Sequence, residues 1–207
     1  PILGCEVYVA PRTMGDREPR IDDNLFHLVL LAETQEGYRN LMALVSEAYL
    51  HGFYYKPRVD KELLARYSEG LIARSACIAG EIPTYLLQGD WEGARKAALA
   101  YREIFGTDSF FLELQDHGMA EEEEVNRKLI SLARELGLPL VASNDVHYVE
   151  KADARAHDVL LCIQTGKTIE DTNRLRFPSP EFYLKSGAEM AALFAEVPEA
   201  LANTRAI

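Results

Sequence analysis

The chain has few cysteines and none of the long apolar runs that mark membrane segments. Only three of its 207 residues are cysteine, at Cys5, Cys77 and Cys162. So few scattered thiols make a poor disulfide framework, which predicts a reducing, cytoplasmic location. No apolar stretch approaches the ~18 residues that a membrane span needs, and no signal peptide is visible. We therefore expect no membrane partner.

Positive charge is also scarce. The chain has 22 Lys and Arg residues against 33 Asp and Glu, which gives a net charge of −11. This balance argues against a surface that holds duplex DNA along its backbone, because such surfaces are basic. A small pocket for a strand end remains compatible with the charge, since bound metal ions would supply positive charge locally.

Short apolar runs alternate with amphipathic runs of helix length. Strands are expected at 2–9, 25–32, 70–75, 109–115 and 139–144, and helices at 36–50, 91–105 and 121–136. Asp90 suits the N-cap of the second helix, and Gly137 suits the end of the third. This alternation predicts an α/β fold with a largely parallel sheet, either a barrel or doubly wound. Beyond Tyr148, helices are expected at 151–163 and 187–207, with a polar loop between them.

Both ends of the chain lack the usual signals of a terminus. Pro1 opens a strand-like run without an initiator Met, and Ile207 closes a helical run without a stop signal. We expect that the chain was cut from a longer polypeptide.

Residues able to bind metal recur at or near the ends of the expected strands. They are Glu6, His27, Cys77, Glu113, His117, Asp145 and His147. Side chains at the carboxyl ends of parallel strands converge on one face, and carboxylate, imidazole and thiolate together suit Zn²⁺, Mn²⁺ or Fe²⁺. Taken singly, each has an ordinary structural alternative, such as a buried thiol at Cys77 or an Asx turn at Asp145. His51 and His157 have no ligand partner at a useful spacing and are expected to be structural or exposed.

A second pattern mixes aromatic and basic residues. Within 51–58, the side chains of Tyr54, Lys56 and Arg58 suit stacking on bases and pairing with phosphates. The segments 174–177 and 182–185 repeat this composition. The alternative is a packed loop whose basic groups point into water. No nucleophile elbow, P-loop or dinucleotide fingerprint is present.

Several motifs together resemble a known family. They are Gly4-Cys5-Glu6, His27-Leu28-Val29-Leu30-Leu31-Ala32, Gly52-Phe53-Tyr54-Tyr55-Lys56-Pro57-Arg58, Leu112-Glu113-Leu114-Gln115-Asp116-His117-Gly118, Asn144-Asp145-Val146-His147-Tyr148 and Phe182-Tyr183-Leu184-Lys185-Ser186. In order and spacing they are similar to the polymerase and histidinol phosphatase (PHP) domain, in the version at the front of the bacterial DNA polymerase III alpha subunit. The resemblance implies a distorted (β/α)₇ barrel, incomplete at its N-terminus, over residues 1–186. It implies a helical connection towards the polymerase body over 187–207.

The resemblance also implies roles for individual residues. Glu6, His27, Cys77, Asp145 and His147 fall on ligand positions of a cluster of up to three divalent transition-metal ions, which would be zinc, manganese or iron. The family pattern has further ligands upstream of Gly4. His117 and Glu113 fall in a motif near the site and are the candidate catalytic residues, with His117 facing substrate or supporting the ligands.

The function implied is that of a replicative DNA-directed DNA polymerase, a nucleotidyltransferase, whose PHP domain is a metal-dependent 3′–5′ exonuclease. A phosphatase or pyrophosphatase is a close chemical variant. The alternative is a structural and interaction module that stabilises the polymerase core and docks a separate proofreading exonuclease. Expected partners are the polymerase body of the same chain, a DNA 3′ end and replisome subunits. Retention of acid, imidazole or thiol at the matching positions favours the enzyme.

Overall fold

A six-stranded mixed sheet forms the centre of the computed structural model, which describes all 207 residues. The strands are β1 (Leu3–Val9), β2 (Phe26–Ala32), β3 (Arg58–Val59), β4 (Leu71–Arg74), β5 (Phe110–Leu114) and β6 (Leu140–Ala142). Their order across the sheet is β3-β1-β2-β4-β5-β6. β2 runs antiparallel to both β1 and β4, and the other three pairings are parallel.

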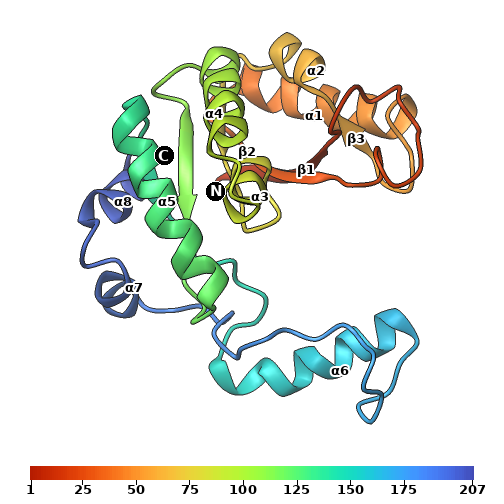
Figure 1. The fold of residues 1–207 in the computed structure, drawn as a ribbon, viewed down its shortest axis with the longest axis vertical. Coiled ribbons are helices and arrows are strands. Elements are labelled where there is room, and N and C mark those ends of the chain that lie inside the picture. The colour runs from red at the N-terminus through yellow and green to blue at the C-terminus, as the bar shows by residue number, and fades with distance from the viewer.

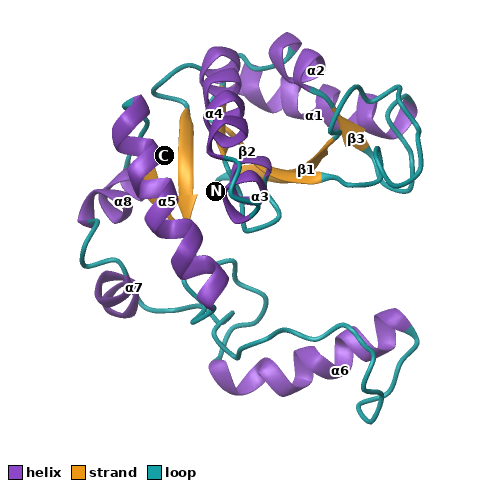
Figure 2. Cartoon of the chain, in the orientation of Figure 1, coloured by secondary structure: helices purple, strands orange, loops and turns teal.

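Eight α-helices and two short 3₁₀ helices connect and cover the strands (Figure 2). They are α1 (Gln35–Leu50), α2 (Lys61–Arg66), α3 (Glu81–Leu87), α4 (Trp91–Phe105), α5 (Ala120–Leu136), η1 (Lys151–Asp153), α6 (Ala154–Thr165), α7 (Gly187–Leu193), α8 (Pro198–Ala202) and η2 (Asn203–Arg205). Asp90 caps α4 by accepting from the Gly93 amide at 2.8 Å. Gly137 ends α5 in the left-handed region, with φ 65°. None of the helices is both long enough and apolar enough to cross a membrane.

The α/β class is confirmed, and the sheet differs from the expected architecture in two details. The sheet is mixed, because β2 runs against both of its neighbours. It is also open, not a closed barrel: β3 and β6 form its two edges and do not pair with each other. A barrel closes only when every strand has a neighbour on both sides, and the two-residue β3 and three-residue β6 each have one.

The two faces of the sheet differ in chemistry because side chains alternate along each strand. One face belongs to the main core, where Leu30, Ala73 and Leu112 are fully buried beneath α1, α4 and α5. The opposite face carries Glu6, Tyr8, His27, Arg74 and Glu113 near one end, as the strand register shows. A small apolar cluster of Ile72, Phe111 and Val141 lies further along this face, with Ile207 packed against it.

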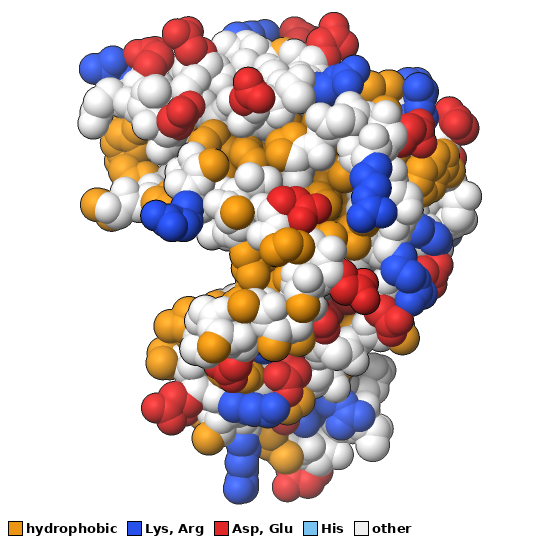
Figure 3. All heavy atoms as spheres, turned by 90° about the vertical axis from the view of Figure 1, so that its left-hand side faces the viewer, with side chains coloured by type: hydrophobic (Ala, Val, Ile, Leu, Met, Phe, Trp, Pro, Cys, Tyr) orange, Lys and Arg blue, Asp and Glu red, His pale blue; other side chains and the backbone are white.

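The ribbon is C-shaped in the view of Figure 1, with the sheet and α1–α4 in the upper part and α6 in the lower part. Figure 3 shows a notch in the outline between the upper and lower parts of the molecule, with hydrophobic side chains at its margin. The segment from α7 to η2 returns to the sheet. There Phe194, Val197 and Ala200 join the main core, and the Asn203 amide donates to the Leu140 carbonyl at 2.8 Å. A domain boundary at residue 186 stays a prediction.

Candidate functional site

Three of the predicted ligands meet on the polar face of the sheet. The Nδ1 atom of His27 lies 3.3 Å from Glu6 Oε1 and 3.6 Å from Cys77 Sγ. His27 reaches this place because β2 is antiparallel, so that the start of β2 lies beside the end of β1, with His27 opposite Tyr8. Cys77 follows β4 after Ala76, whose φ of 61° is rare for a residue with a side chain. That turn directs the chain back towards His27.

Hydrogen bonds and nearby charges shift the pKa values of His27 and Glu6. The side-chain hydrogen bonds of His27 with Cys77 and with Glu6, which accepts, raise the pKa of His27 to about 10, against the opposing effect of burial. The His27 hydrogen bond in turn lowers the pKa of the Glu6 carboxyl, and the charges of His27 and His147 lower it further. His147 therefore lies within electrostatic range of the group.

Asp145 and His147 form a second group, on the irregular segment that follows β6. Asp145 has φ 40°, so the segment Asp145-Val146-His147 does not continue the extended conformation of β6. Instead, the His147 ring turns back on the segment. Its Nδ1 lies 2.7 Å from the Asp145 carbonyl oxygen and 4.0 Å from the Asp145 carboxylate. The backbone amide of His147 donates to the Phe182 carbonyl at 2.8 Å, which fixes the segment from the other side.

The structure contains no group of three or more His, Cys, Asp or Glu side chains arranged to hold a metal ion. The donor chemistry around His27 nevertheless suits one. Two donors bound to the same tetrahedral zinc lie about 3.3–3.6 Å apart, which follows from the usual zinc–ligand bond lengths. The Glu6–His27 and His27–Cys77 distances of 3.3 and 3.6 Å match that separation. The donor pairs Glu6–His27 and His27–Cys77 therefore have the spacing of metal ligands, and the metal site itself stays a prediction.

His117, a candidate catalytic residue, is completely buried. Its Nδ1 lies 2.6 Å from Glu122 Oε1, its Nε2 lies 3.0 Å from the Asn144 carbonyl oxygen, and its ring stacks on Phe182. Both ring nitrogens face oxygen atoms, and the imidazolium form can donate to both of them. Burial acts to lower the pKa of His117, but Glu122 and the Asn144 carbonyl outweigh it and the pKa is raised. This geometry supports a positioning role next to Asp145 better than a proton relay.

Glu113, the other candidate catalytic residue, is also buried, on β5. Its Oε1 accepts from the Ser143 hydroxyl and pairs with Arg74 Nη1 at 3.2 Å. Its Oε2 is buried without a partner. Glu113 thus retains one free acceptor on the polar face of the sheet.

The three expected substrate-binding residues have different surroundings. Arg58 is fully buried, which removes it from contact with a bound substrate because its guanidinium is enclosed by the chain. It donates to backbone carbonyls of Met14, Asp16, Asp22 and Gly52, and stacks over the Tyr54 ring at 5.1 Å. Lys56 is exposed and lies nearer the candidate ligands, with its Nζ 5.4 Å from the centre of the Tyr8 ring.

Two neighbours of the ligands were missed from the sequence. The Tyr8 ring meets the His27 ring edge-on with centroids 5.3 Å apart. His157, which was expected to be structural or exposed, lies 5.6 Å from the His147 ring, and Phe177 lies 4.6 Å from it. For Tyr8 the strand alternation with Glu6 was an available signal. No spacing in the sequence links His157 to His147.

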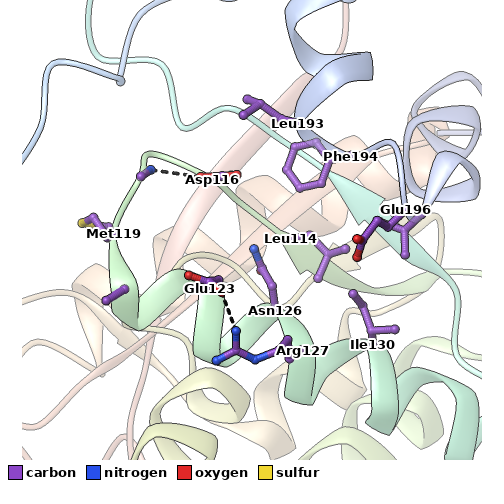
Figure 4. A pocket seen from close by; sticks show the side chains of 13 residues that line it. Leu114, Asp116, Met119, Glu123, Asn126, Arg127, Ile130, Leu193, Phe194 and Glu196 are labelled. Carbon is purple, nitrogen blue, oxygen red and sulfur yellow. Dashed lines mark hydrogen bonds and ion pairs between the residues drawn. The ribbon is translucent and has the colours of Figure 1, made fainter.

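A cavity of about 670 Å³ lies away from this chemistry, between α5 and the α7–α8 segment (Figure 4). Asp116, Glu123 and Arg127 line one side, and Leu193 and Phe194 line the other. None of the predicted ligands lines it, so the candidate site is defined by its side chains and not by the size of a cavity.

Comparison with known proteins identifies the family of the chain. Residues 1–117 match the PHP domain family. The DNA polymerase III subunit alpha of Treponema pallidum is 54% identical over 204 residues, that of Borreliella burgdorferi 47% over 205, and that of Thermus aquaticus 48% over 198. These alignments cover 95–99% of this chain but only 16–18% of the length of each relative. With more than half of its residues matched to the family model, the chain belongs to the PHP domain family.

Proposed function

We propose that this chain is the PHP region of a replicative DNA polymerase of the polymerase III alpha kind, and that it is a metal-dependent phosphoesterase of the 3′–5′ exonuclease class. The observation that carries the proposal is the approach of Glu6 and Cys77 to the same nitrogen of His27. In that polypeptide the open sheet would form one part of the distorted barrel. Its partners would be the polymerase body, the 3′ end of DNA and other replisome subunits.

The ligand set proposed for zinc, manganese or iron is Glu6, His27, Cys77, Asp145 and His147. A bound divalent metal would polarise a phosphodiester and make water a better nucleophile at neutral pH. The chain's own residues set the conditions for that chemistry. His27 must release its proton to act as a ligand. Lys56, whose Nζ lies 5.4 Å from the centre of the Tyr8 ring, would offset phosphate charge.

A second function is supported by the surface of α6. Leu160 is 60% exposed and Ile163 is 72% exposed, and Leu175 from the following loop is 54% exposed. Three exposed apolar side chains on α6 and the loop after it are typical of a surface that another protein segment covers. We propose that α6 and the loop after it dock in the parent assembly, either on the polymerase body or on a separate proofreading exonuclease. This docking role is compatible with the nuclease function.

The test uses the full-length polypeptide that contains this chain. We expect Asp145→Asn and His27→Ala each to reduce release of 3′-terminal nucleotides from single-stranded DNA by about 100-fold or more, because each removes one ligand. Primer extension by the same preparation should change little. His51→Ala, on the exposed end of α1, is the matched control and should retain both activities.

Metal content provides the second measurement. We expect the wild-type protein to retain at least one equivalent of zinc, manganese or iron after dialysis, and the Asp145→Asn and His27→Ala variants to retain less. A wild-type protein without bound metal, or variants with undiminished nuclease activity, would show that these side chains are not ligands. The interaction role would then be the better account.

A further inference from the structure

A second, smaller cavity lies beside His147, because two of its lining residues, His157 and Phe177, contact the His147 ring. Its volume is about 310 Å³, and it lies where the start of α6 meets the loop that follows α6. Three arginines line it, Arg155, Arg174 and Arg176, with Asp158 as the single acidic residue. This local excess of positive charge stands out in a chain whose net charge is −11.

Arg174 forms a fixed part of the cavity wall, because its side chain is only 5% exposed. Asp158 holds its guanidinium in a two-point ion pair, with Arg174 Nη2 2.8 Å from Asp158 Oδ2. The Nε–H of Arg174 is buried and has no acceptor. A buried donor without a partner costs free energy that a bound acceptor recovers. Arg155 and Arg176 are exposed at the cavity and are left without a carboxylate in the lining.

Aromatic side chains connect this cavity to the candidate metal ligands. The Phe177 ring lies 4.7 Å from the His157 ring and 4.6 Å from the His147 ring. Both Phe177 and His157 line the cavity, while His147 is one of the proposed ligands. An aromatic face beside a group of arginines is the combination that binds a base and its phosphate in single-stranded DNA.

We propose that this cavity, which we call the Arg174 pocket, binds the phosphate and base of a nucleotide close to the 3′ end of a single DNA strand. The inference rests on the proposed nuclease function and identifies where its substrate lies. A volume of 310 Å³ is at the lower end of ligand sites, which start at about 300 Å³, and suits one nucleotide. The acidic composition of the whole chain favours a single strand end over a duplex lying across the surface.

The experiment is photo-crosslinking with the full-length polypeptide. The probe is a single-stranded oligonucleotide that carries 5-iodouracil at the penultimate position from its 3′ end. Crosslinked peptides are identified by mass spectrometry. We expect a crosslink at Phe177 or His157, and we expect it to persist in chelator, since the arginines do not need metal. Mapping the crosslinked residue separates this binding from binding at the polymerase site.

The variant is the double substitution Arg155→Ala and Arg176→Ala, because both residues are exposed and their loss should not prevent folding. We expect the crosslink to fall at least fivefold and KM for 3′-end hydrolysis to rise about tenfold, with kcat little changed, since two phosphate contacts are lost. The matched control is Arg39→Ala with Arg66→Ala, which removes two exposed arginines from α1 and α2. The control should leave the crosslink and KM unchanged.

The outcomes separate this inference from the proposed function. A crosslink at Phe177 or His157 that is lost in the double variant supports the Arg174 pocket even if no protein in the series hydrolyses DNA. Hydrolysis with the same KM in the wild type and the double variant, and no crosslink to either ring, overturns the Arg174 pocket and leaves the nuclease function standing.

Discussion

The guanidinium of Arg58 joins three segments of the chain at the edge of the sheet. It donates to carbonyls of the loop after β1, at Met14, Asp16 and Asp22, and to Gly52 at the end of α1. All of these bonds are lost at once if the side chain is removed, and the buried carbonyls cannot all regain partners from water.

We therefore expect Arg58→Ala to lower the free energy of unfolding by about 3 kcal/mol, since hydrogen bonds from a charged donor contribute about 1.5–3 kcal/mol each and partial relaxation offsets some of them. Denaturant unfolding measures this change. Lys56→Ala, two residues away and exposed, should change stability by less than about 0.5 kcal/mol. Equal effects for the two variants would show that Arg58 does not hold these segments together.

The buried pair of His117 and Glu122 gives a pH-dependent contribution to stability. Since the pKa of His117 is raised in the folded chain above its usual value of 6.5, the contribution is fully present below pH 6.5 and is lost as pH rises through the raised pKa. Glu122→Gln removes the carboxylate that faces Nδ1. We expect the stability difference between wild type and Glu122→Gln to be larger at pH 6 than at pH 9, measured by urea unfolding at each pH. A difference that does not vary with pH would argue against a charged His117.

At the scale of elements, long periodic segments were predictable and short ones were not. The α4 helix begins and ends as the sequence indicated, because Asp90 and Gly106 mark its limits and apolar residues recur over four turns. The shorter α2 and α3 were missed, since six or seven residues are too few to establish a helical period. The direction of β2 was also missed, because direction depends on which strands pair and not on the strand's own residues.

Part of the candidate site could likewise be predicted from the sequence, and part could not. Glu6, His27 and Cys77 were among the residues expected to converge, and the structure brings Glu6 and Cys77 to His27. His27 reaches this place from the start of the antiparallel β2, and not from the carboxyl end of a parallel strand. Their role as ligands stays a prediction. The structural position of Arg58 and the contact of His157 with His147 could not be predicted, since both depend on how a loop folds back on distant or irregular segments.

At the scale of the whole molecule, the open sheet depends on the end of the chain for part of its core. The β6 edge strand has one paired neighbour, β5, and α8 packs beside it. Phe194 is 4% exposed and belongs to the main core, while the adjacent Leu193 is 39% exposed. Both side chains face the cavity between α5 and α7 (Figure 4). Residues 187–207 thus contact the sheet through a few apolar side chains.

These two neighbours provide a direct measure of how far residues 187–207 are part of the folded unit. We expect Phe194→Ala to lower the free energy of unfolding by about 3–4 kcal/mol, because it removes a large buried ring from the main core. Leu193→Ala should lower it by less than about 1 kcal/mol, since that side chain is already partly in water. Thermal and denaturant unfolding of both variants in the same preparation of the chain would measure the contrast.

If the two variants were equally stable, residues 187–207 would be a connection that rests on the sheet without stabilising it, and a domain limit at residue 186 would follow. If the contrast is found, the helices after Ser186 and the sheet unfold as one unit.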